Sequence, residues 1–121
     1  MRYHSTRNKD TAITAAEAIA GGLASDGGLY VPDSFPKLTD GDILKLADMD
    51  YRGRAKYILG LYLDGFTQEE IGGFTEKAYA DNFDTDSAAP VRRLDGDTHC
   101  LELWHGPTAA FKDMALQMLP F

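Results

Sequence analysis

The stretch His105-Gly-Pro-Thr-Ala-Ala-Phe-Lys-Asp113 marks the point where the chain is expected to leave a strand and enter a helix. Pro107 has a fixed backbone angle that suits the first turn of a helix, and a threonine such as Thr108 is a favoured helix N-cap. The sequence therefore predicts a strand that ends at residues 101–104, a sharp turn, and a helix that starts near Thr108. It places Lys112 about one turn into that helix.

Lys112 occupies a position that suits a chemically active amine. The N-terminal end of a helix carries partial positive charge, so it does not stabilise a charged lysine. That field and an apolar neighbour such as Phe111 both favour the neutral amine, which is the form that attacks an aldehyde carbonyl. Because a single lysine in a helix is usually only solvated, the position alone leaves both interpretations open.

The composition argues against several classes of function. The 121 residues include 19 acidic and 12 basic ones, for a formal net charge of -7, and the basic residues are scattered along the chain. Nucleic acid and anionic membranes are therefore not expected as partners. No apolar run approaches the roughly 20 residues of a membrane span, and the first five residues lack the apolar core of a signal peptide. We therefore expect a cytoplasmic protein.

The cysteine and the histidines give no sign of a metal site. Cys100 is the single cysteine, so it cannot form an internal disulfide, and it is expected to be a small buried residue in a strand. His4, His99 and His105 have no metal-ligand spacing. We therefore predict no metal, and the role of His105, which lies in the lysine segment, stays open.

The first 86 residues are expected to be mostly helical. Three helix starts are marked by Thr14-Ala-Ala-Glu17, Thr39-Asp-Gly-Asp42 and Thr67-Gln-Glu-Glu70. In each, a threonine can cap the helix, and in the first and third a glutamate three residues later completes a capping box. The strongest apolar stripe at helical spacing runs from Tyr51 to Leu63, which predicts a helix packed on a core.

Short strands are expected among these helices. Residues 2–6 could form an edge strand, and Leu29-Tyr-Val31 has the composition of a short buried strand. In the helix between them, Ile19 and Leu23 are expected to continue the apolar face, since they are four residues apart.

An acidic stretch over residues 81–86 is typical of a connection, and we place a domain boundary there, between residues 1–86 and 87–121. Two β-forming runs, 91–94 and 98–104, then flank the short-turn signal Asp95-Gly-Asp97 and predict a hairpin. The expected fold class is therefore α+β. A mostly helical N-terminal domain with short strands is followed by the opening hairpin and helix of an α/β domain.

Three segments together carry a resemblance to a known family. The stretch from His105 to Asp113 resembles the cofactor-lysine segment of threonine synthases, pyridoxal-phosphate enzymes of the tryptophan-synthase-beta-like class. Tyr3-His-Ser-Thr-Arg7 resembles the family's N-terminal Tyr-x-Ser-Thr-Arg. Gly22-Leu-Ala-Ser-Asp-Gly-Gly-Leu-Tyr-Val-Pro32 resembles its Gly-Leu-Ala-x-Asp-Gly-Gly-Leu-Tyr-Val-Pro signature. One departure is Asn8, where the family commonly has glycine, although asparagine tolerates left-handed backbone.

This resemblance implies a reaction and a cofactor. Threonine synthases convert O-phospho-L-homoserine and water to L-threonine and phosphate with pyridoxal 5'-phosphate. By resemblance, Lys112 is the catalytic residue that holds the cofactor and then moves protons on the substrate. Thr108 and Phe111 would shape the cofactor site. Asp113 points about 100° away around a helix, so it is expected to support the site instead of reacting.

The N-terminal signature supplies candidates for the substrate. The hydroxyls of Ser5 and Thr6 and the guanidinium of Arg7 can donate to a phosphate or a carboxylate, and the substrate of threonine synthases carries both groups. An ordinary capped turn is the equally weighted alternative for these residues.

The chain is far shorter than a complete threonine synthase, so the resemblance implies an N-terminal fragment whose partner is the remainder of the catalytic domain. Groups for the cofactor's phosphate and ring nitrogen are not identifiable, so the chain alone is predicted to be inactive. Its last segment leaves an apolar set without partners, which could drive self-association. That set consists of Phe111, Met114, Leu116, Met118 and Leu119.

Two alternatives differ from this interpretation. The chain could be a noncatalytic interaction module that docks through an acidic helical face, with Lys112 only solvated. It could also belong to another pyridoxal-phosphate enzyme, such as a serine or threonine dehydratase, although the two N-terminal signatures favour threonine synthase.

Overall fold

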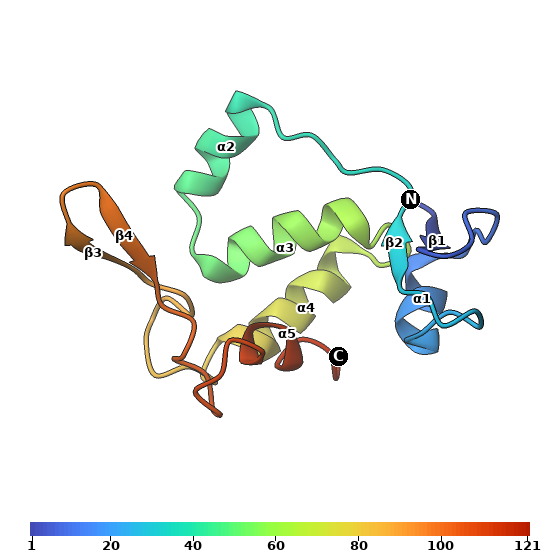
Figure 1. Cartoon of the computed structure of the whole chain (residues 1–121). Helices are drawn as coiled ribbons and strands as arrows, with labels where there is room; N and C mark the ends of the chain where they lie inside the picture. Colours follow the sequence, from blue (N-terminus) through green and yellow to red (C-terminus); the bar gives the residue numbers. More distant parts are fainter.

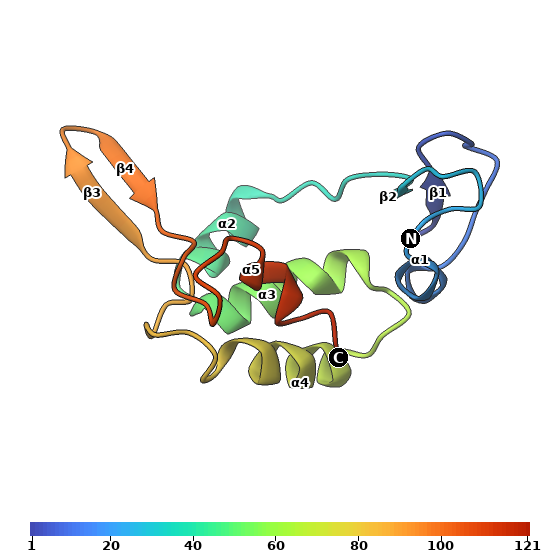
Figure 2. The same ribbon diagram turned by 60° about the horizontal axis from the view of Figure 1, so that its bottom comes forward.

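The computed structural model describes all of residues 1–121 and contains five helices and four strands. The elements in chain order are β1 (Tyr3–Ser5), α1 (Ala15–Gly21), β2 (Tyr30–Pro32), α2 (Asp40–Ala47), α3 (Tyr51–Tyr62), α4 (Gln68–Tyr79), β3 (Val91–Asp95), β4 (Thr98–Leu101) and α5 (Asp113–Leu116). The unit of β1, β2 and α1 and the β3–β4 hairpin lie at opposite ends of the molecule, with α3 and α4 between them (Figures 1 and 2).

The N-terminal unit is a two-stranded antiparallel sheet with one helix. Tyr3 lies opposite Pro32 and Ser5 opposite Tyr30, so the predicted edge strand is confirmed. The second strand is not buried as expected: its residues are half-buried, and the preceding Leu29 is 60% exposed. A sheet of only two strands leaves one side of each strand uncovered, which accounts for this difference.

The predicted capping box of α1 is present, because Thr14 and Glu17 exchange hydrogen bonds. The predicted apolar face is wrong, since Ile19 is 51% exposed and Leu23 is 61% exposed. The helix instead buries its small side chains, Ala15 and Ala18. A seven-residue helix against a two-stranded sheet offers too little surface to cover larger side chains as well.

The helix α2 also starts with a capping box, between Thr39 and Asp42, but it buries none of its residues. Its C-terminal end is held by Arg54 of α3, whose guanidinium donates to the carbonyls of Leu46 and Ala47. These bonds bring side-chain donors to carbonyls of the last turn of α2, where Leu46 also accepts from the amide of Asp48, so α2 is attached by its end more than by its face.

The pair α3 and α4 provides the best-packed part of the chain. Ile71 and Ala78 of α4 are fully buried and Thr75 is 2% exposed, so this face of α4 provides the core of the pair. The rings of Tyr51 and Tyr79 meet edge to face at 5.0 Å, which joins the start of α3 to the end of α4. Gly72 and Gly73 are tolerated inside α4 because of this packing.

The predicted hairpin is confirmed, but its second strand is shorter than expected. Val91 pairs with Leu101, the turn holds Gly96 with a left-handed φ of 51°, and a bulge separates Arg93 from Asp95. The expected strand to residue 104 ends at Leu101, because the chain beyond it turns towards Asp84 of the connecting segment, whose amide donates to the carbonyl of His105. Figure 2 shows the hairpin projecting from the helices, and every β3 residue is exposed.

The last helix differs most from the prediction. It was expected to start near Thr108, yet α5 begins at Asp113 and contains four residues. Ala109 has a φ of 56°, which a right-handed helix cannot contain. Lys112 is therefore the residue before the helix, not one turn inside it.

Only ten of the 121 residues are buried, and many large apolar side chains are exposed at the surface. None of the helices has the length and apolar character needed to cross a bilayer. The proposed boundary after residue 86 falls in the irregular segment between α4 and β3. A hydrogen bond from Tyr79 to the carbonyl of Met114 joins the two sides, and the boundary stays a prediction.

Candidate functional site around Lys112

Lys112 ends a loop that Asp113 closes. Asp113 is 1% exposed, and its carboxylate accepts hydrogen bonds from both the amide and the hydroxyl of Thr108, at 2.8 Å each. Burial alone would raise the pKa of Asp113, but the bonds from Thr108 and from the backbone of Ala110 outweigh it and lower the pKa. The expected supporting role of Asp113 thus has a geometric basis: its negative charge holds the loop shut.

Two other residues of the loop, Gly106 and Ala109, have a backbone environment that this closed conformation requires. A Cβ added at Gly106 would lie 2.4 Å from the Cβ of Asp113, so only glycine fits there. Ala109 is the one non-glycine residue with a positive φ, a conformation that costs about 1 kcal/mol or more for such a residue. The loop therefore holds a conformation that the surrounding contacts impose.

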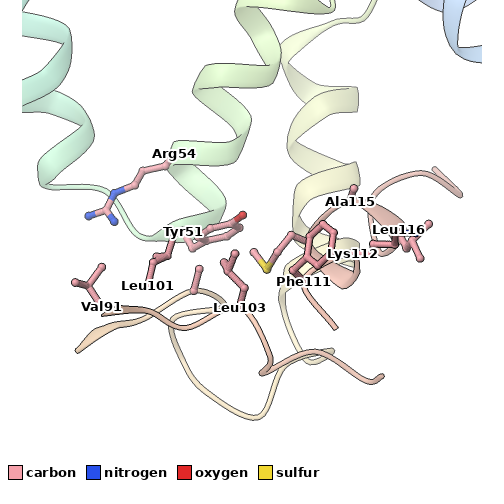
Figure 3. Close-up of a pocket in the computed structure, with 11 residues that line it drawn as sticks. Tyr51, Arg54, Val91, Leu101, Leu103, Phe111, Lys112, Ala115 and Leu116 are labelled. Atoms are coloured by element: carbon pink, nitrogen blue, oxygen red, sulfur yellow. The ribbon is translucent and has the colours of Figure 1, made fainter. Parts of the chain in front are cut away.

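Lys112 and Phe111 line an open hollow of about 860 Å³. Nine of its eleven lining residues are hydrophobic, and they come from α3, the hairpin and the chain around α5. Figure 3 shows Tyr51 between Val91 and Leu101 on one side and Phe111 on the other. Lys112 takes part in none of the ion pairs of the chain, so its amine is available beside an apolar surface.

Two tyrosines connect the hollow to the helical pair. The hydroxyl of Tyr79 donates to the carbonyl of Met114 at 2.7 Å, which attaches α5 to α4. Burial raises the pKa of Tyr79 to about 12, with a smaller contribution from Tyr51. Burial also raises the pKa of Tyr51, so both rings are neutral at ordinary pH. The hollow is thus lined on one side by the neutral ring of Tyr51, which packs against the neutral ring of Tyr79.

His105 lies where the loop begins, between two carboxylates. Its Nε2 is 2.8 Å from an oxygen of Glu102 and its Nδ1 is 2.5 Å from an oxygen of Asp84. Its ring stacks on Trp104 with centroids 5.6 Å apart. Hydrogen bonds that the ring donates to Glu102, and then to Asp84, raise the pKa of His105.

The N-terminal candidates form a separate cluster. Ser5 is fully buried, and its hydroxyl donates to the Asp26 carboxylate at 2.8 Å. Thr6 accepts from the amide of Leu29, and the Arg7 guanidinium donates to the carbonyl of Asp26. The segment around Asp26 is a tight turn, in which Gly27 has a φ of 76°. The two N-terminal signatures are therefore bonded to each other. They form one joint, which consists of residues 5–7 and the turn at residues 26–29.

The structure thus brings some predicted site residues together and separates others. Phe111 and Lys112 share the hollow, while Thr108 serves the loop through Asp113. Ser5, Thr6 and Arg7 lie in and after β1, at the end of the molecule away from the hairpin (Figure 1). Sequence reasoning missed Tyr51 as a neighbour of the lysine segment, since it assigned that ring only to the core stripe of a helix.

Comparison with known proteins agrees with this architecture. A family model described as "Threonine synthase N terminus" matches residues 2–79. The structure superposes on the PLP-bound threonine synthase from Brucella melitensis with a TM-score of 0.91 and 36% identity, covering 98% of this chain and 26% of that one. For the threonine synthase from yeast, the TM-score is 0.89 and the identity 33%, over 98% of this chain and 25% of that one.

Sequence relatives point the same way. Threonine synthase from Pseudomonas aeruginosa is 40% identical over 120 residues, which cover 98% of this chain and 25% of the relative. Human threonine synthase-like 1 is 44% identical over 108 residues, or 87% of this chain and 14% of the relative. The fold is thus that of the N-terminal region of threonine synthases.

The chain belongs to the threonine synthase N-terminal family. It spans about a quarter of the length of the threonine synthases that it matches.

Proposed function

We propose that this chain is the N-terminal part of a pyridoxal-phosphate-dependent threonine synthase, which converts O-phospho-L-homoserine and water to L-threonine and phosphate. The observation that carries the proposal is the closed loop that presents Lys112, without an ion-pair partner, beside an apolar hollow. The family membership supports it and favours threonine synthase over a dehydratase or a noncatalytic module.

The residues around Lys112 fit an aromatic aldehyde cofactor. The hollow offers the flat side chains of Phe111 and Tyr51 beside a primary amine. When bound, pyridoxal phosphate would supply an aldehyde for the amine and a ring that draws electrons from the substrate carbons. Lys112 would hold the cofactor and then, as a free amine at Nζ, accept and return protons on the substrate. Phe111 and Thr108 would shape this site, Thr108 through the loop that it closes with Asp113.

The N-terminal residues enter the proposal in different roles. The hydroxyl of Ser5 is committed to Asp26, and that of Thr6 to the amide of Leu29. We propose that both shape the joint, and that Arg7, which remains exposed, is the member of the three available to a phosphate or carboxylate of the substrate.

A chimeric enzyme tests the proposal. The corresponding N-terminal segment of the Pseudomonas aeruginosa threonine synthase would be replaced by this chain, and threonine and phosphate release from O-phosphohomoserine would be measured. We expect turnover in the chimera and a loss of at least about a thousand-fold in the Lys112→Ala variant, because the amine performs both the holding and the proton transfer.

A matched control separates this role from general effects of losing a lysine. Lys37 is exposed in the loop between β2 and α2, so Lys37→Ala should leave turnover unchanged. A folded chimera in which Lys112→Ala turns over as fast as the parent would overturn the proposal.

A further inference from the structure

We propose that His105 is a positioning residue: as an imidazolium it latches the lysine loop to the connecting segment after α4 and to the chain after β4. The inference rests on the proposed function only in naming Lys112 as the group that is positioned. The latch itself concerns the conformation of this chain and can be tested without any reaction.

The contacts of the His105 ring depend on how many protons the ring carries. Both ring nitrogens of His105 face carboxylate oxygens, one from Asp84 and one from Glu102. An ionised carboxylate only accepts hydrogen bonds, and a neutral imidazole has a single N–H to donate. Both contacts are therefore satisfied together when the ring carries two protons. A neutral ring would leave one nitrogen lone pair against a carboxylate.

The charges around the ring favour the protonated form. The side chains of His105 and Glu102 are only 14% and 16% exposed, whereas that of Asp84 is 75% exposed. Glu102 thus makes the more shielded contact. The remaining charged neighbour is Arg92 of β3, with its Nε 3.8 Å from the same oxygen of Glu102, and the ring of Trp104 covers one face of the imidazole. His105 therefore lies near two carboxylates, those of Asp84 and Glu102, and one guanidinium, that of Arg92.

The latch is connected directly to the lysine loop. The carbonyl of His105 accepts a hydrogen bond from the amide of Asp84 at 3.0 Å, so these two residues are joined through both backbone and side chain. The next residue, Gly106, packs against Asp113 and accepts a bond from the amide of Ala109 at 3.1 Å. His105 is thus three residues before Thr108, which Asp113 holds in the closure that presents Lys112.

The direction of the pH dependence follows from these contacts. Because the pKa of His105 is raised in the folded chain, the latch contributes fully below the ordinary histidine value of about 6.5. Its contribution is lost as the pH rises through the raised pKa. Above that point, the neutral ring can donate to one of its two carboxylates only.

The test is an NMR pH titration of the wild-type 121-residue chain. We expect the His105 ring to titrate above the ordinary histidine value. Through the same pH range, amide exchange of Asp84 and Ala109 should accelerate about tenfold beyond the intrinsic dependence on hydroxide, as expected for the loss of one charge-assisted contact. A His105 ring that titrates at the ordinary value, or exchange at both amides that follows hydroxide alone, would overturn the latch.

Two variants sharpen the result. Glu102→Gln removes the more shielded anion, so the titration midpoint of His105 should fall. Asp95→Asn removes an exposed carboxylate that makes no contact with His105 and should leave the midpoint unchanged. Equal shifts in both variants would contradict the specific contact and indicate general electrostatics instead. Because the wild-type titration stands alone, the latch can be refuted even if Glu102→Gln does not fold. Failure of the chimeric enzyme would reject the proposed function and leave this titration unaffected.

Discussion

The carboxylate of Asp113 holds both the amide and the hydroxyl of Thr108, five residues earlier in the chain. This clasp replaces the helix start that the sequence predicts at Thr108, and it leaves Lys112 as the last residue before α5. The threonine thus donates to a side chain instead of capping a helix, and the lysine is presented by a closed loop.

Replacing Thr108 by valine should loosen this clasp. The substitution keeps the shape of the side chain but removes one hydrogen bond to a charged acceptor, which is worth about 1.5–3 kcal/mol. We expect roughly tenfold or greater acceleration of amide exchange at position 108. Thr98→Val, on the exposed face of β4, is the matched control and should have little effect. Unchanged exchange at position 108 would show that the hydroxyl does not hold the loop.

Acid titration of Asp42 provides a second prediction. The hydroxyl of Thr39, then its amide, then the hydroxyl of Tyr57 lower the pKa of Asp42 to about 2. Because this pKa is depressed, the contribution of Asp42 to stability is present above the ordinary value of about 3.9 and is lost as the pH falls towards 2. Tyr57→Phe removes one donor, so the Asp42 carboxyl should titrate higher, as followed by carbon NMR. Tyr62→Phe should not change it, and an identical midpoint in all three chains would refute this account.

Gly28 and Gly73 should respond to alanine in opposite directions. A Cβ at Gly28 would lie 2.1 Å from the hydroxyl oxygen of Ser5, so Gly28→Ala is expected to lower the free energy of unfolding by about 1–3 kcal/mol. A Cβ at Gly73 meets nothing within 4 Å, so Gly73→Ala in α4 should raise it by about 0.5–1 kcal/mol. Urea unfolding followed by circular dichroism measures both values. Equal effects would mean that the joint around Ser5 is looser than the contacts indicate.

The 121-residue chain by itself should not complete the proposed reaction. Lys112 is exposed and its hollow is open, so nothing in the chain excludes water or holds the far side of a cofactor. Addition of pyridoxal phosphate should give no saturable one-to-one adduct by absorbance, and no threonine should form from phosphohomoserine. The Lys112→Ala chain provides the background, and stoichiometric labelling above it would contradict this prediction.

The apolar residues near the C-terminal end should promote association between copies of the chain at high concentration. Phe111 and Leu119 are each 66% exposed, and Leu116 is 50% exposed. Leu119→Lys should reduce the association, while Leu94→Lys, at a comparably exposed site on the hairpin, should reduce it less. Sedimentation velocity measures this, and a strictly monomeric wild-type chain at high concentration would count against it.

Local signals in the sequence predicted the starts of α1, α2 and α4 correctly, but not that of α5. Thr14, Thr39 and Thr67 all cap helices as expected, and an aspartate at position 50, which sequence reasoning overlooked, caps α3. The apolar face predicted for α1 was wrong, whereas α4 does bury large side chains such as Ile71. The difference is one of surroundings: α4 packs along a second long helix, whereas α1 meets only two short strands.

The site was less predictable because its parts lie far apart in the chain. The sequence identified Lys112 and Phe111, but it could not place Tyr51 beside them or His105 against Asp84. No periodicity or motif links residues at such separations, since their contacts depend on how α3, α4 and the hairpin pack.

The sequence by itself determined the helix caps and the hairpin turn, because each depends on hydrogen bonds and backbone angles within about four residues. Only the tertiary structure decided the conformation of the lysine loop and the side chains that surround the amine. The buried charge of Asp113, the space at Gly106 and the left-handed backbone of Ala109 together outweigh the local preference for a helix.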